Sequence, residues 1–264
     1  MKVLVKLGGT LLDDAAKRHD LARQLAQVAN SAHHVELVVV HGGGKQVTRF
    51  LAERGVESRF VNGLRVSDES VMDAVTKVIA GGINKQLVAA LCAAGKPAVG
   101  LSGVDGLLTI AEALHPDLQF VGKPQRTDAK LFSLLLGAGY LPVVACLAAD
   151  SQGNIYNVNA DQMAVSCASG WQADKLLFLT DVAGVKNGQG SVIPRMTPAG
   201  AHNLIASGVA HGGMQAKLEA ALWALEGGLS EVLIAPGQEA DICGRLLAGE
   251  PVGTRLSRKD NAHE

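Results

Sequence analysis

Six short aliphatic runs recur along the chain and alternate with longer segments whose apolar residues follow helical spacing. The runs occupy residues 2–7, 36–41, 98–101, 142–147, 175–180 and 231–235. The expected helices occupy residues 15–32, 45–54, 68–94, 129–138, 160–169, 198–207 and 214–226. Such alternation is typical of βαβ units, in which parallel strands form a sheet that helices cover on both faces. We therefore predict an α/β fold built on a mainly parallel sheet.

Length and composition limit the remaining choices. The chain has 264 residues, of which 48% are hydrophobic and only 3% aromatic, so the core should be aliphatic. This length fits one large unit or two closely packed lobes, with a soft division near residues 169–174. The formal net charge of −1 provides no field that would gather nucleic acid or anionic lipid. We therefore expect a small-molecule ligand.

The compartment is predicted from the cysteines and from the lengths of the apolar runs. No run approaches the roughly 20 apolar residues that span a bilayer, and the chain opens on a strand-like stretch rather than a signal peptide. The cysteines lie far apart without a C-x-x-C pair, at Cys92, Cys146, Cys167 and Cys243. Free buried thiols explain them better than a metal site. We expect a cytoplasmic protein without a membrane partner.

Glycine and polar residues follow the predicted strands where those strands end. Ligands of open α/β sheets bind outside the carboxyl ends of the strands, so this rim is the expected site. The segments at this rim are Lys6-Leu7-Gly8-Gly9, His41-Gly42-Gly43-Gly44, Leu101-Ser102-Gly103, Thr180-Asp181 and Pro236-Gly237.

The glycine triplet in "VVVHGGGKQV", residues 38–47, fits neither common nucleotide motif. A Walker A loop would need Ser or Thr after Lys45, where Gln46 stands, and a dinucleotide fingerprint would need glycine in place of Val47. What remains is a strand–glycine–helix junction, whose free N–H groups and positive helix end suit an anion. A tight turn without a ligand is the alternative.

Two lysines occupy positions that disfavour a cation. Lys6 lies in a strand that should be buried, where an unpaired ammonium group is costly to desolvate. Lys217 is expected in the first turn of a helix, where the macrodipole opposes positive charge. Both placements indicate an anionic ligand. Lysines that extend to solvent would explain them equally well.

Asp161 is expected in the first turn of the helix that follows "YNVNAD", with Asn159 as its N-cap. Complementation of the helix dipole could account for this carboxylate without any ligand. Asn157 precedes it on an extended segment and is either a turn residue or an amide that faces the rim. The alternatives stay open for both residues.

A hairpin is expected within "SRFVNGLRV", residues 58–66, because Asn62-Gly63 is a favoured type I′ turn pair. It would project from the sheet as a lid. Arg65 follows the turn, and its planar guanidinium group suits the bidentate capture of a carboxylate. An exposed arginine without a role is the alternative.

Seven segments appear in the order found in acetylglutamate kinases of the amino acid kinase family, and the resemblance covers the chain from Lys2 to about Leu256. They are "KLGG", "VVVHGGGKQV", "NGLRVS", "VGLSGVDG", "NVNADQMA", "LTDVAGV" and "GGMQAKLEAAL". The resemblance implies a three-layer αβα sandwich with one continuous sheet. Residues 1–170 would bind N-acetylglutamate and form a dimer, and residues 171–264 would bind ATP.

The resemblance also implies roles for individual residues. Lys6 and Lys217 match the lysines that neutralise the transferring phosphoryl group, and Asp161 matches the carboxylate that positions them. The acceptor would be bound by Gly42, Gly43, Gly44, Arg65, Asn157 and Asn159. ATP would be bound by Gly8, Gly9, Asp181, Gly212, Gly213 and Met214.

The implied reaction is ATP-dependent phosphorylation of the γ-carboxylate of N-acetyl-L-glutamate in arginine biosynthesis. A carboxylate with a reference pKa of about 4.3 is already a nucleophile at neutral pH, so no general base is needed. Mg²⁺ should arrive on the phosphates of ATP, because the sequence offers no acidic cluster as a protein metal site.

Arginine-inhibited relatives carry an extra helix before the first strand, whereas here that strand begins at about Lys2. We therefore expect a homodimer insensitive to arginine, packed through the helical region 68–94.

Two other functions remain open. A related kinase could act on an acetylaminoadipate derivative, and a catalytically silent sensor could use the same fold. The pattern "NGLRVS" favours the glutamate acceptor, and retention of both lysines with Asp161 disfavours the sensor. Residues 115–123 match no motif.

Overall fold

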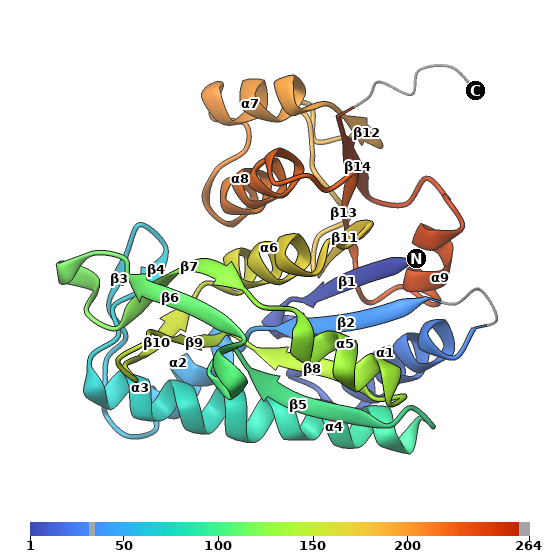
Figure 1. The fold of residues 1–264 in the computed structure, drawn as a ribbon. Coiled ribbons are helices and arrows are strands. Elements are labelled where there is room, and N and C mark those ends of the chain that lie inside the picture. Colours follow the sequence, from blue (N-terminus) through green and yellow to red (C-terminus); the bar gives the residue numbers. More distant parts are fainter. Residues whose placement is uncertain (32–34, 259–264) are drawn as a thin grey trace.

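The protein is described by a computed structural model that covers residues 1–31 and 35–258. Its framework is an eight-stranded sheet in the order β12-β14-β13-β11-β1-β2-β8-β5 (Figure 1). The strands are β1 (Lys2–Leu7), β2 (Glu36–His41), β5 (Ala98–Ser102), β8 (Leu141–Ala145), β11 (Lys175–Thr180), β12 (Arg195–Met196), β13 (Glu231–Pro236) and β14 (Thr254–Ser257).

The pairing of this sheet is parallel except between β13 and β14, which run antiparallel. The predicted mainly parallel sheet is therefore confirmed. β1 lies near the middle and pairs with β2 on one side and β11 on the other. The carboxyl ends of these three strands consequently bring Lys6, His41 and Thr180 to one rim.

Alternate side chains of the central strands point into two separate aliphatic cores. Leu4 and Val40 pack on one face with α6 (Ala160–Trp171) and α8 (Gly212–Glu226). Val5 and Val39 pack on the other face with α1 (Ala15–Ala29), α4 (Asn84–Ala93) and α9 (Ile242–Leu247). Figure 1 shows α6 on one side of the sheet and α1 with α4 on the other. The predicted three-layer αβα sandwich is confirmed.

The remaining helices are α2 (Gly44–Ala52), α3 (Glu69–Val75), α5 (Lys130–Gly137) and α7 (Pro198–Ala206), with the short helices η1 (Gly9–Leu12), η3 (Asp105–Leu107) and η4 (Pro116–Leu118). The single helix predicted over 68–94 is interrupted by η2 (Thr76–Ile83), which is a π-helix. The helix predicted over 15–32 ends at Ala29, and residue 32 lies outside the described residues.

A small closed barrel adjoins the large sheet and was not predicted. It consists of β6 (Thr109–Ala113), β7 (Val121–Thr127), β9 (Leu147–Ala149) and β10 (Ile155–Val158). The strand predicted over 142–147 was wrong in extent, because the chain leaves β8 at Ala145 and enters the barrel at Leu147. The unassigned segment 115–123 contains η4 and the start of β7.

The hairpin predicted at Asn62-Gly63 is confirmed. β3 (Phe60–Val61) and β4 (Leu64–Arg65) pair antiparallel as a separate two-stranded sheet. Asn62 and Gly63 both have positive φ, of 50° and 77°, as a type I′ turn requires.

All four cysteines are free, and Cys92 is exposed while the other three are buried. Burial raises the pKa of the Cys146 thiol to about 11 and that of Cys167 to about 12. Thiols with such pKa values are inert at neutral pH. Across residues 1–31 and 35–258, none of the helices combines the length and the hydropathy that a bilayer crossing requires.

Candidate active site

Three charged residues from distant parts of the sequence meet at the carboxyl rim of the large sheet. Lys6 Nζ lies 2.6 Å from Asp161 Oδ1, and Lys217 Nζ lies 3.7 Å from Asp161 Oδ2. The two ammonium groups therefore approach opposite oxygens of one carboxylate. The side chains of Lys6 and Asp161 are each 9% exposed and that of Lys217 is 19% exposed, so solvent screens these ion pairs only weakly.

The protonation state of Asp161 follows from two opposing effects. Burial disfavours the carboxylate, but the ammonium groups of Lys6 and Lys217 outweigh it and lower the pKa of Asp161 below its ordinary value. The centre therefore carries two positive charges and one negative charge at neutral pH. The excess positive charge faces the rim, where an anion would compensate it.

Asp161 is positioned by the start of α6. Asn159 is the N-cap of this helix, and its Oδ1 accepts hydrogen bonds from the backbone N–H groups of Asp161 and Gln162 at 2.9 and 3.2 Å. The predicted cap is therefore confirmed. Because this side-chain oxygen is occupied by the cap, a contact between Asn159 and a substrate would have to use its amide nitrogen.

Lys217 lies differently from the prediction. We expected it in the first turn of a helix that begins at Met214, but α8 begins at Gly212, so Lys217 is in the second turn. The helix dipole opposes its charge less strongly there. The Lys217 ammonium group also lies 3.4 Å from the carbonyl oxygen of Gly213. Its pairing with Asp161 is a better indication of its role than its place in the helix.

Two glycine turns face each other beside this centre. Gly8 and Gly9 follow β1, and Gly43 is the N-cap of α2. A Cβ atom built on Gly9 would lie 3.6 Å from Gly43 Cα and 3.7 Å from Gly43 N. The absence of a side chain at position 9 therefore leaves the space directly beside the backbone nitrogen of Gly43 free of side-chain atoms from this residue.

The three glycines after β2 lack side chains for different reasons. A Cβ on Gly43 would lie 2.4 Å from Ile83 Cδ1, so this glycine permits close packing on η2. A Cβ on Gly42 would lie 3.1 Å from Ala160 Cβ, at the start of α6. A Cβ on Gly44 would meet nothing within 4 Å. Gly44 alone borders open space.

Gln46 connects the two glycine turns and was not among the predicted site residues. Its Nε2 donates a hydrogen bond to the carbonyl oxygen of Gly9 at 3.1 Å. Its Oε1 is buried without a hydrogen-bond partner. Gln46 occupies the third position of α2, directly after Gly44 and Lys45, so its proximity to the triplet was its one signal in the sequence.

Arg65 is buried, with 7% of its surface exposed. Its guanidinium group donates hydrogen bonds to the carbonyl oxygen of Gly44 and to Thr48 Oγ1, both at 2.8 Å, and a third to Ser58 Oγ. It also lies over the ring of Phe60, 4.7 Å from the centroid. These contacts fix the hairpin against the start of α2 and place Arg65 beside the glycine triplet.

Asn157 lies on β10 and donates a hydrogen bond from Nδ2 to Ser67 Oγ at 3.1 Å. Ser67 is fully buried and donates in turn to the carbonyl oxygen of Arg65 at 2.9 Å. Asn157 and Arg65 are thereby joined through one serine. Ser67 is the residue of this group that was not predicted.

The remaining predicted residues lie in the carboxyl-terminal part of the chain. Asp181 is exposed directly after β11, where one of its oxygens accepts a hydrogen bond from Thr180 Oγ1 at 3.2 Å. Gly212, Gly213 and Met214 form the first turn of α8, one turn before Lys217. Gly212 has a φ of 54°, which favours glycine.

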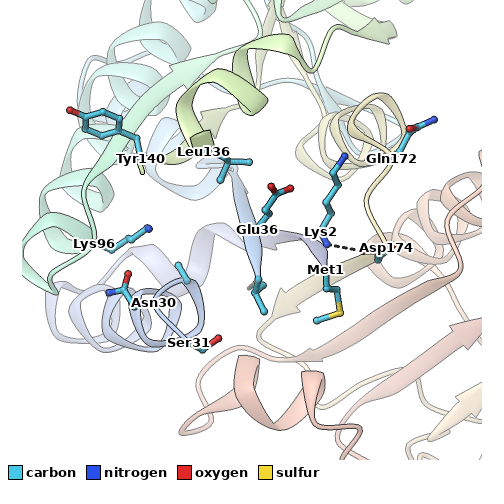
Figure 2. Close-up of a pocket in the computed structure, with 12 residues that line it drawn as sticks. Met1, Lys2, Asn30, Ser31, Glu36, Lys96, Leu136, Tyr140, Gln172 and Asp174 are labelled. Carbon is cyan, nitrogen blue, oxygen red and sulfur yellow. Dashed lines mark hydrogen bonds between the residues drawn. The ribbon is translucent and has the colours of Figure 1, made fainter. Parts of the chain in front are cut away.

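A cavity of about 710 Å³ lies at the opposite end of the sheet, where the strands begin. Figure 2 shows Lys2, Glu36, Lys96 and Asp174 among the residues that line it. Asp174 accepts a hydrogen bond from the backbone N–H of Lys2 at 2.7 Å. The cavity is large, but it is remote from Lys6, Asp161 and Lys217, so we place the candidate site at the other rim.

No group of three metal-ligating side chains occurs within residues 1–31 and 35–258. Asp161 is the carboxylate at the centre of the site, and both of its oxygens face ammonium groups. This donor set does not fit a protein-held Mg²⁺ ion, which prefers several oxygen ligands and bound water.

Comparison with known proteins shows the family of this chain. The profile of the amino acid kinase family matches residues 1–236. Acetylglutamate kinase of Solibacter usitatus is 54% identical over 97% of this chain and 99% of its own length. Acetylglutamate kinase of Koribacter versatilis is 42% identical over 91% of this chain and 92% of its own length.

Solved structures give the same result. N-acetylglutamate synthase from Neisseria gonorrhoeae, in complex with coenzyme A and N-acetyl-glutamate, superposes with a TM-score of 0.85 at 26% identity, covering 98% of this chain and 59% of that one. Carbamate kinase of Giardia shares the fold, with a TM-score of 0.69 at 16% identity, covering 98% of this chain and 99% of that one. The resemblance inferred from the seven segments is confirmed, and the chain belongs to the amino acid kinase family.

Proposed function

We propose that this protein is an acetylglutamate kinase, which transfers the γ-phosphoryl group of ATP to the γ-carboxylate of N-acetyl-L-glutamate. The observation that carries the proposal is the pairing of Lys6 and Lys217 with opposite oxygens of Asp161 beside two glycine turns. The names of the relatives, at up to 54% identity over nearly the whole chain, support the choice of substrate.

The reaction needs positioning and charge neutralisation rather than proton transfer. A γ-carboxylate oxygen of the acceptor attacks the γ-phosphorus of ATP, and the bond from that phosphorus to the bridging oxygen breaks. The electron pair leaves with ADP, and no proton moves. Lys6 and Lys217 offset the repulsion between the anionic reactants. Asp161 keeps the two ammonium groups apart and aimed at the phosphate.

The acceptor binds among residues of the amino-terminal lobe, 1–170. Arg65 and Asn157 contact its α-carboxylate, and the amide nitrogen of Asn159 completes this set. The backbone N–H groups of Gly42, Gly43 and Gly44 face the acceptor and the transferring phosphoryl group. The buried hydrogen-bond chain through Ser67 supports the proposal, because it holds Asn157 and Arg65 in one geometry.

ATP binds along the lobe formed by residues 171–264. Gly8 and Gly9 meet its β- and γ-phosphates, and the remaining contacts come from Asp181, Gly212, Gly213 and Met214. Mg²⁺ enters on the phosphates and keeps several waters. The engaged state of Asp161 supports this, since the carboxylate is already balanced by two lysines.

The proposed enzyme acts in the cytoplasm, in arginine biosynthesis, as a homodimer packed through the helical region 68–94. The free cysteines support a reducing compartment. Light scattering at several protein concentrations tests the dimer, and a monomer or a hexamer would contradict it.

The substrate is tested by trapping the acyl phosphate with hydroxylamine while ADP release is followed in parallel. We expect a much higher kcat/KM with acetylglutamate than with acetylaminoadipate. Comparable values would indicate a broader acceptor site. Calorimetric binding of ATP with neither hydroxamate nor ADP formed would identify a silent sensor and overturn the proposal.

A further inference from the structure

His41 is a buried histidine to which the proposed reaction assigns no task. It is the last residue of β2, it has no exposed surface, and the glycine triplet follows it directly. Its Nδ1 lies 3.0 Å from the carbonyl oxygen of Gly42, and its Nε2 lies 3.0 Å from Asn84 Nδ2. Both ring nitrogens therefore have polar partners in an otherwise aliphatic core.

These partners define the protonation of the ring. Asn84 Nδ2 also lies 3.0 Å from the carbonyl oxygen of Val143, which can only accept, so the Asn84 amide nitrogen is the donor. His41 Nε2 must then accept from Asn84. The carbonyl of Gly42 likewise requires a donor at His41 Nδ1. Both ends of the ring demand the same neutral tautomer, with its proton on Nδ1.

The surrounding packing is built to hold Asn84. A Cβ atom on Gly100 of β5 would lie only 1.9 Å from Asn84 Oδ1, so this edge strand has no side chain where the amide sits. The ammonium group of Lys85 donates to Asn84 Oδ1 at 3.1 Å and fixes the same amide orientation. Asn84 is also the first residue after the π-helix η2, whose Ile83 packs on Gly43.

We propose that His41 and Asn84 are a positioning pair that orients the Gly42–Gly43 peptide for phosphoryl transfer. In a planar peptide the C=O and N–H bonds point in opposite directions. A hydrogen bond from His41 to the Gly42 carbonyl therefore sets the direction of the Gly43 N–H. A Cβ atom on Gly9 would lie 3.7 Å from the nitrogen of that N–H, so the two glycine turns meet at this group. The proposal rests on the proposed function.

Two isosteric variants separate positioning from bulk stability. In His41→Asn the side-chain NH₂ takes the place of Nδ1 and can donate to the Gly42 carbonyl. In His41→Gln the amide reaches the place of Nε2, keeps the contact with Asn84 and loses the one to Gly42. Loss of one neutral hydrogen bond that is needed only for correct aim predicts a kcat about tenfold lower for H41Q than for H41N. We expect similar KM for ATP and similar urea midpoints for the two variants.

Equal kcat values for H41N and H41Q at equal stability would overturn the proposal. So would a loss seen only in the urea midpoint, which is what a packing role predicts. If the wild-type protein formed no acyl phosphate, the proposed function itself would be refuted. Failure of the positioning pair and failure of the proposed function are thus distinguishable.

A measurement on the unmodified protein keeps the proposal testable if both variants misfold. In NMR spectra of protein labelled with ¹⁵N-histidine, we expect the ring of His41 to be a neutral Nδ1–H tautomer that does not titrate near neutral pH. Its signals are assigned by their absence from the spectrum of either variant, or by the slow exchange of the buried Nδ1–H proton. A neutral Nε2–H tautomer or an imidazolium ring at this position would overturn the pair.

Discussion

Asn in place of Asp161 should strongly destabilise the protein, because it leaves a buried ammonium group without a counter-charge. At 2.6 Å the attraction between Lys6 and Asp161 is about 6 kcal/mol for an effective dielectric constant of about 20. Desolvation of both groups cancels part of this attraction. Removing one partner of a buried pair typically costs about 3–5 kcal/mol, and we expect D161N to fall in that range.

A double-mutant cycle isolates the pair from other effects of the substitution. Lys6→Met removes the cation and leaves Asp161 paired with Lys217 at 3.7 Å, so it should cost less than D161N. The combined variant K6M/D161N should be more stable than the sum of the single losses predicts, with a coupling energy of about 2–3 kcal/mol.

Urea unfolding followed by tryptophan fluorescence provides the measurement, since Trp171 is buried and Trp223 is partly exposed. Shifts of the midpoint at constant slope report stability. A D161N midpoint within about 0.5 kcal/mol of wild type, or strict additivity in the cycle, would refute the reasoning that this carboxylate balances buried charge.

Three further outcomes are expected. Lys217→Ala should lower kcat by about 10²–10³ with folding retained, as for loss of one preorganised donor, and near-normal turnover in steady-state kinetics would remove Lys217 from the mechanism. Gly43→Ala should lower the free energy of unfolding by about 1–3 kcal/mol, because its Cβ would lie 2.4 Å from Ile83 Cδ1. Gly44→Ala, whose Cβ would lie in open space, should leave the urea midpoint nearly unchanged. Equal midpoints for the two variants would contradict this contrast. Burial lowers the pKa of His41 to about 4, and Lys85 adds to that effect, so from about pH 6.5 down to about pH 4 the unfolded state binds the extra proton. The free energy of unfolding should therefore decrease as the pH is lowered through this range, by up to about 1.4 kcal/mol per pH unit from His41. If the urea midpoint of H41N depended equally steeply on pH, His41 would not be responsible.

The large sheet could be predicted because its central strands are continuous aliphatic runs that are buried on both faces. The bounds predicted for residues 2–7, 36–41 and 175–180 agree with β1, β2 and β11. The cap at Asn159 was equally predictable, since an N-cap depends only on a side chain and the two residues after it.

The small barrel could not be predicted from the same kind of pattern. β7 contains Pro124, which cannot donate to a ladder, and polar residues on its exposed face. Its partner β6 shifts register between Ile110 and Ala111, opposite that proline. Neither strand shows a regular alternation, and each is stabilised by closure with β9 and β10, which lie further along the chain.

The location of the site at the carboxyl ends of the strands was predictable, but the contacts among its side chains were not. The sequence placed Lys6 and the glycines at strand ends, whereas the meeting of Lys217 with Asp161 depends on how α8 packs against α6. The contact of Asn84 with His41 was not predictable for a different reason. The π-helix before it changes the phase of the helix, and a pattern of regular 3.6-residue turns cannot show which side chain then faces His41.

The position of β1 between two neighbours makes the two lysines unequal in mobility. Withdrawing the backbone of Lys6 would break ladders with β2 and β11 at once, whereas α8 in the outer layer can tilt while its own hydrogen bonds persist. We therefore expect the backbone of Lys6 to stay fixed, and Lys217 to change position when α8 tilts. Amide hydrogen exchange should be slowest at the strand and faster at the helix start.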